Sequence, residues 1–166
     1  MHFAWIVSTA LSLHAQSPQG CMIGVGAGAD KRWHFDAAFA STRWGATARG
    51  LHVGGIGSQK DDNQPSSPYT QKAPGSYEDV TECSGFQIGA FADWGRAWAA
   101  IGAETLTRKV KAYTVAADHT WATAPGERET GGQGAYLKVG YRLGSWSIFA
   151  GFGTQSKAQG GLAVHF

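Results

Sequence analysis

Charge is scarce in this 166-residue chain, and so are long apolar runs. Only 16% of the residues are charged, and the formal net charge is +2. This mild balance argues against the strongly basic surface on which nucleic-acid binding depends. The longest apolar run, from Phe3 to Leu13, is well short of the roughly 20 residues that a membrane-spanning helix needs. The sequence therefore disfavours both a nucleic-acid-binding protein and a helical membrane protein.

Cysteine is also scarce, with Cys21 and Cys83 far apart in the chain. No spacing of Cys and His resembles a metal-ligand set, so we expect no metal and no cofactor.

The first residues have the pattern of an export signal. After the apolar run, Leu13-His14-Ala15 forms a small-residue cleavage pattern before Gln16. The segment has no Lys or Arg, so the usual positive n-region is missing. We expect residues 1–15 to be a signal peptide and residues 16–166 to form one domain. A buried N-terminal strand or helix is the alternative.

Glycine, tryptophan and period-two alternation are what the chain has in abundance. It contains 24 Gly and 7 Trp, and no helical period. Turn-forming residues divide it into eight alternating segments, at about 22–29, 33–41, 44–57, 80–94, 96–115, 132–143, 146–155 and 161–166. The pattern predicts an all-β fold, a closed antiparallel up-and-down eight-stranded β-barrel.

The connections are expected to be very unequal. Residues 58–79 and 117–132 are long and polar, and we predict loops there because neither stretch can bury enough apolar surface to fold alone. If the strands run up and down, both loops fall at one end of the barrel. Three short breaks, each carrying Trp, fall at the other end. Outer-membrane barrels have this asymmetry, so the barrel is predicted to be transmembrane.

One face of each predicted strand is apolar, and the other mixes glycine with charge. Alternation alone does not say which face points inward. Glycines on the polar face and tryptophans at strand ends favour an apolar exterior. The third strand fits only if a bulge near Gly50 shifts its phase. The expected lumen charge network is Asp36, Arg49, Asp93, Arg96, Glu104, Lys138 and Arg142. The expected lipid-facing aromatic girdle is Trp33, Trp44, Trp94, Tyr141, Trp146 and Phe166.

Together these features resemble the small eight-stranded outer-membrane β-barrels of Gram-negative bacteria, the OmpA/OmpX type. The most specific feature is the last strand, in which Leu162, Val164 and Phe166 alternate up to the final residue. This is similar to the signal that the barrel-assembly machinery recognises in that family. The resemblance implies a monomeric, porin-like barrel in the outer membrane of the cell envelope, in contact with membrane lipid and lipopolysaccharide. The two cysteines and the charge-poor signal depart from the family pattern.

A structural or surface-interaction role follows from this resemblance, either adhesion or membrane integrity. Lumen charges of both signs must pair, and we therefore expect a plugged interior. Specific contacts are expected in the long loops, at Tyr69, Tyr77 and Trp121. Arg108, Lys109 and Lys111 lie near the expected outer surface, where they can pair with lipopolysaccharide phosphates.

Two other functions stay open. In a soluble exported barrel the apolar face would point inward and bind a small apolar ligand. A barrel enzyme that modifies envelope lipid would need a nucleophile, a base and an orienting acid close together. His34 and Asp36 share a face, but no Ser is evidently paired with them. We therefore do not expect an enzyme.

Overall fold

The computed structural model describes residues 20–29, 32–44, 47–58 and 64–166, and within 42–44 only the backbone. The predicted signal peptide, residues 1–15, lies outside the described residues. No helix in the described ranges has the length and hydropathy to cross a membrane. The described strands are β1 (Cys21–Gly28), β2 (Arg32–Trp44), β3 (Thr47–Ser58), β4 (Gly75–Asp93), β5 (Ala97–Val115), β6 (Trp121–Thr123), β7 (Arg128–Leu143), β8 (Trp146–Gly153) and β9 (Lys157–His165).

Eight of these strands form a closed barrel. Their order is β4-β3-β2-β1-β9-β8-β7-β5, and pairing between β4 and β5 closes the ring. Every pairing around the ring is antiparallel. The short strand β6 stands outside the ring and pairs with the far end of β5. The predicted closed, antiparallel, up-and-down eight-stranded barrel is confirmed.

The two ends of the barrel differ, and we call them the turn end and the loop end. At the turn end, tight connections join β4 to β5 and β7 to β8. Gly95 and Gly144 occupy these turns with φ of 88° and 71°, a backbone conformation that favours glycine. Cys21 and Phe166 meet at the same end through two backbone hydrogen bonds of 2.9 and 3.2 Å. The β3–β4, β5–β7 and β8–β9 connections lie at the loop end.

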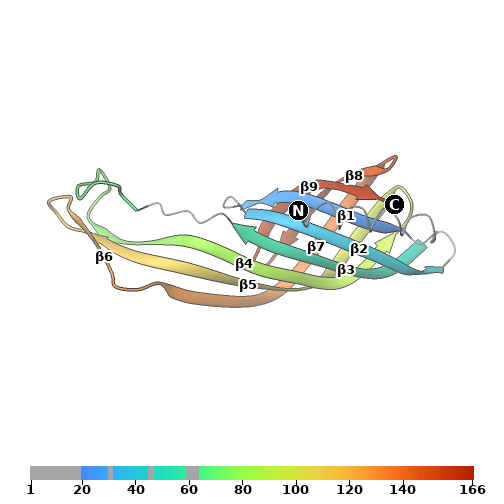
Figure 1. Cartoon of the computed structure of the whole chain (residues 1–166), viewed down its shortest axis with the longest axis horizontal. Coiled ribbons are helices and arrows are strands. Elements are labelled where there is room, and N and C mark those ends of the chain that lie inside the picture. Colours follow the sequence, from blue (N-terminus) through green and yellow to red (C-terminus); the bar gives the residue numbers. More distant parts are fainter. Residues whose placement is uncertain (1–19, 30–31, 45–46, 59–63) are drawn as a thin grey trace, which may run out of the picture.

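Three strands continue far beyond the barrel at the loop end. The pairing of β4 with β3 stops at Ser84, which pairs with Gly57, yet β4 begins at Gly75 and is paired with β5 from there on. Residues 75–83 of β4, 108–115 of β5 and 128–130 of β7 form a protruding sheet with β6 at its tip, which we call the arm (Figure 1). At about 3.3 Å per residue, nine residues of β4 extend roughly 30 Å.

The arm shows that the loop predictions for residues 58–79 and 117–132 are partly wrong. Both stretches contain strand: β4 starts inside the first, and β6 and the start of β7 lie inside the second. Both stretches are held by the backbone hydrogen bonds of the paired sheet and by aromatic contacts at the tip. A prediction from composition alone does not include these contacts.

The predicted bulge near Gly50 is also misplaced. The register shift lies in the neighbouring strand β2, between Ala40 and Thr42. Because β3 keeps its phase, Ala48 packs against the interior cluster while Arg49 is exposed, in phase with exposed Leu51. The prediction that Arg49 belongs to the lumen network is therefore wrong.

Candidate functional site: the barrel surface, its interior and the arm

The outside of the barrel is apolar over all eight strands. Side chains as large as Val, Leu, Ile and Phe are 41–61% exposed there, and we call them the belt. Its members include Val25, Phe39, Leu51, Val53, Phe86, Ile88, Ile101, Leu137, Val139, Leu143, Ile148, Phe152 and Leu162. A soluble monomer rarely exposes a contiguous apolar surface of this kind.

Aromatic side chains border the belt. Trp94, Tyr141 and Trp146 lie near the turn end and Trp33 near the loop end, and each is about half exposed. Phe166 is half-buried at the turn end. The side chain of Trp44 lies outside the described part of the chain. Trp98, in contrast, points into the barrel and is 1% exposed.

A charge pair occupies the middle of the barrel interior. Asp36 on β2 bonds Lys138 across the barrel on β7, and both side chains are fully buried. The same carboxylate oxygen accepts His52 Nε2–H at 3.0 Å. The other ring nitrogen of His52 then accepts the Tyr136 hydroxyl at 2.7 Å. The charges are thus neutralised inside a connected hydrogen-bond network, which a low-dielectric interior demands.

A second carboxylate fixes the connection between β8 and β9 inside the loop end. Glu104 Oε1 accepts the backbone N–H groups of Gln155 and Ser156 at 2.6 and 3.2 Å. Its Oε2 accepts the Ser156 hydroxyl at 2.6 Å and the Gln87 amide at 2.9 Å. Arg108 donates to the carbonyl of Gln155 at 2.9 Å from the other side. We call residues 154–156 the cap, because these bonds hold it in the mouth of the barrel.

Some buried polar atoms between the charge pair and the cap lack a protein partner. Among the described residues these include both ring nitrogens of His34, Asp36 Oδ2, Gln87 Oε1 and Gln159 Oε1. Buried groups of this kind normally bond ordered water. The predicted face shared by His34 and Asp36 exists, but no serine in the described part of the chain bonds to His34.

Toward the turn end the interior changes from polar to aromatic. Trp98 packs between Phe91 and Phe149, with ring centroids 5.8 Å apart in each pair. Met22 and Ala163 complete this buried layer. Large aromatic side chains therefore pack together at this level of the barrel interior.

Below the aromatic layer the structure assembles a Ser, a His and an Asp that sequence reasoning missed. Ser147 Oγ lies 2.9 Å from His165 Nε2, and His165 Nδ1 lies 3.8 Å from Asp93 Oδ2. Arg142 Nη2 lies 3.2 Å from the same carboxylate oxygen. Trp98 Nε1–H donates to Ser147 Oγ at 3.1 Å.

A Ser hydroxyl bonded to a His ring nitrogen is one element of a hydrolase site. A nucleophile needs approach by substrate and nearby oxyanion donors. Ser147 is fully buried, and one of the two lone pairs of its oxygen accepts the Trp98 N–H. Ser147 is thus bonded to His165 and Trp98, whereas the Asp93 carboxylate lies closer to Arg142 than to His165.

The predicted lumen network can now be placed residue by residue. Asp36, Glu104 and Lys138 are buried inside. Asp93 is 6% exposed and lies beside Arg142, whose side chain is 25% exposed. Arg49 faces outward. Arg96 is exposed in the turn between β4 and β5. The prediction that it lies in the lumen is wrong, because β5 begins only at Ala97 and Arg96 therefore does not follow the alternation of that strand. Its carbonyl accepts Arg142 N–H at 2.8 Å.

The tip of the arm is a folded aromatic cluster. Tyr77 and Tyr113 stack across β4 and β5 with centroids 5.4 Å apart, and Trp121 packs edge-on against Tyr113 at 6.0 Å. Lys72 lies 4.9 Å from the Tyr113 centroid and donates to its hydroxyl. That bond raises the pKa of Lys72 above its ordinary value. Of the three predicted contact aromatics, Tyr69 is 65% exposed, whereas Tyr77 and Trp121 are half-buried within the tip.

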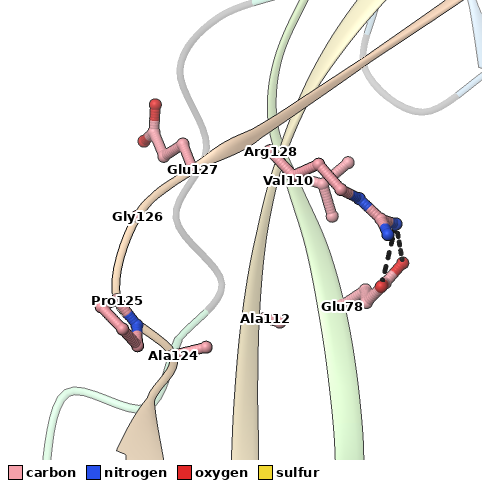
Figure 2. A pocket seen from close by; sticks show the side chains of 8 residues that line it. All are labelled: Glu78, Val110, Ala112, Ala124, Pro125, Gly126, Glu127 and Arg128. Atoms are coloured by element: carbon pink, nitrogen blue, oxygen red, sulfur yellow. Dashed lines mark hydrogen bonds and ion pairs between the residues drawn. The ribbon is translucent and has the colours of Figure 1, made fainter.

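The opposite side of the arm has a hollow of about 190 Å³. Val110 and Ala112 lie along it, the Pro125 segment forms one wall, and the Arg128–Glu78 ion pair of 3.1 Å forms the other (Figure 2).

The cations predicted to meet lipopolysaccharide are engaged within the chain. Lys109 pairs with Glu82 at 2.9 Å, which raises the pKa of Lys109. Lys111, two residues further along β5, pairs with Glu127 at 3.7 Å. The two cysteines lie toward opposite ends, with Cys21 at the turn end and Cys83 packed against Leu106 near the loop end.

No protein-family model, curated protein or solved structure matches this chain.

Proposed function

We propose that this protein is an outer-membrane β-barrel with a plugged lumen, whose arm serves a structural or surface-interaction role outside the cell. One observation carries the proposal: a closed barrel exposes large apolar side chains on every strand and buries Asp36, Lys138 and Glu104 in its interior. In water this arrangement is unfavourable at roughly 25 cal/mol per Å² of apolar surface. In a bilayer it is the arrangement expected of a β-barrel.

The soluble alternative requires the reverse orientation of the faces. A soluble ligand-binding barrel points its apolar face inward, whereas here the interior holds the Asp36–Lys138 pair, the cap and a packed aromatic layer. These features leave an internal apolar ligand without support.

The interior supports the plugged-lumen part of the proposal. The cap occupies the loop end, the charge pair spans the middle, and the aromatic layer around Trp98 fills the level below. Export by a signal peptide and recognition of the Leu162–Phe166 strand by the barrel-assembly machinery are part of the same proposal.

The arm is the feature best placed to act outside the membrane. It extends from the loop end, where outer-membrane barrels carry their long external segments. Its folded tip presents the exposed ring of Tyr69 without the ordering cost that a disordered loop pays on binding. Adhesion to another surface is the role this rigidity favours.

Trypsin treatment of intact cells tests the proposal. We expect cleavage after Arg128, whose side chain is 66% exposed on the arm, and survival of the barrel as a protected fragment in the membrane fraction. Protection of the whole chain in intact cells, or its release in soluble form, would contradict the proposal.

A further inference from the structure

One outward position of the belt lacks a side chain and has no neighbour to cover it. Gly55 on β3 stands in register between Phe35 on β2 and Phe86 on β4. A Cβ placed on Gly55 would meet no atom within 4 Å. Two residues further toward the loop end, Gly57 is covered, because a Cβ there would lie 2.2 Å from the ring of Trp33. The two outward glycines therefore differ: one is filled by the chain itself and the other is open.

The open position is the floor of a slot of about 280 Å³. Its lining consists of Phe35, Val53, Gly54, Gly55, Phe86, Gln87 and Ile88. The side-chain amide of Gln87 is engaged inside the barrel with Glu104, so it offers the slot no free donor. The outward side chains that remain are all apolar. An occupant therefore gains contact area here and no hydrogen bonds.

The size and place of the slot decide between occupants. A second protein chain needs roughly 20–30 residues on each side of a stable interface, and the slot offers seven. It lies three residues from the start of β2, about 10 Å below the mouth of the barrel. At that depth in the proposed membrane the surrounding medium is the upper part of the lipid acyl chains.

We propose that the slot at Gly55 binds one acyl chain of a membrane lipid, held between the rings of Phe35 and Phe86. This inference rests on the proposed membrane location of the barrel. The aromatic walls and the glycine floor let methylene groups approach the backbone, where dispersion contacts accumulate.

Photocrosslinking tests the slot directly. The full chain is folded into phosphatidylcholine vesicles that contain a phospholipid with a diazirine on one acyl chain, and adducts are mapped by mass spectrometry. We expect labelling of the Phe35 and Phe86 segments to exceed that of the belt segment around Leu137 several-fold. Gly55→Leu fills the slot and should reduce this labelling to the belt level. Ala90→Leu adds apolar bulk at an exposed position of β4 outside the slot and should leave the excess intact.

Failure of the slot and failure of the membrane proposal give different results. Uniform labelling around the belt, or unchanged excess labelling in Gly55→Leu, would overturn the acyl-chain site while the barrel remains in the vesicles. Failure of the wild-type chain to enter vesicles would overturn both proposals. Resistance of each variant to SDS before heating shows that it is folded.

Discussion

The pair between Asp36 and Lys138 gives the sharpest energetic prediction. Both side chains are fully buried, on strands that face each other across the barrel. Lys138→Met removes the cation and leaves a carboxylate inside with only its His52 hydrogen bond. Breaking one partner of a buried pair costs about 3–5 kcal/mol, because the remaining charge stays desolvated. We therefore expect Lys138→Met to lower the free energy of unfolding by about that amount.

The matched double variant separates the pair energy from packing. Asp36→Leu with Lys138→Met replaces both charges by apolar groups, and such replacements are often neutral or stabilising. We expect the double variant to lose far less free energy of unfolding than the two single variants lose when their losses are added. Lys109→Met serves as a control, because its ion pair with Glu82 lies on the exposed arm, where such pairs contribute little.

The assay is urea unfolding of the chain in lipid vesicles, followed by tryptophan fluorescence. An effect of Lys138→Met as small as that of Lys109→Met would mean that bulk water solvates the pair, beyond any single ordered water. That result would refute the reasoning that the lumen is plugged.

Three further predictions follow from the cap, the belt and the tip. Glu104→Ala removes four hydrogen bonds from the cap and the residues beside it, and faster amide hydrogen exchange of the β8–β9 connection, with the rest of the barrel unchanged, would show this. Val139→Arg places a charge on the middle of the belt and should destabilise the barrel in vesicles by about 2–4 kcal/mol. Thr107 is exposed next to the arm, so Thr107→Arg should have little effect on stability. Equal effects of the two substitutions would contradict a lipid-facing belt. The pKa of Lys72 is raised by its bond to Tyr113, so this contact is complete below pH 10.5, the ordinary value of that pKa, and is lost as the pH rises through the higher folded-state value; tryptophan emission from the tip should change there and should not change in Lys72→Ala.

Much of the barrel was predictable because alternation is a local property. The faces of β4, β7 and β8 follow from period two, and antiparallel closure follows from the short turns. The position of Arg49 was not predictable, since it depends on which of two paired strands carries the bulge. The strand phase at Arg49 reverses when the bulge is moved from β3 to β2.

The arm was missed for a different reason. Residues 75–79 and 128–131 are polar and have little to bury, so composition classifies them as loop. They form strand because β5 between them continues past the barrel mouth and pairs with both. Propensity is overridden here by the neighbouring backbone.

Contacts across the barrel were beyond sequence reasoning. Ser147 and His165 lie on neighbouring strands, and their shared inward face can be read once the register of β8 and β9 is known. Asp93, which faces them, comes from β4, several strands away around the ring. The partners of Asp36 depend in the same way on the stagger of the closed barrel, which alternation does not specify.

The central claim is that the belt meets lipid. The most direct measurement is to express the full chain in a Gram-negative host, isolate the outer-membrane fraction and run it on SDS gels with and without boiling. The account predicts that the protein is found in that fraction and that its band shifts on heating, as a closed barrel that resists SDS unfolds. A chain that stays soluble and monomeric without detergent, with no shift, would contradict it.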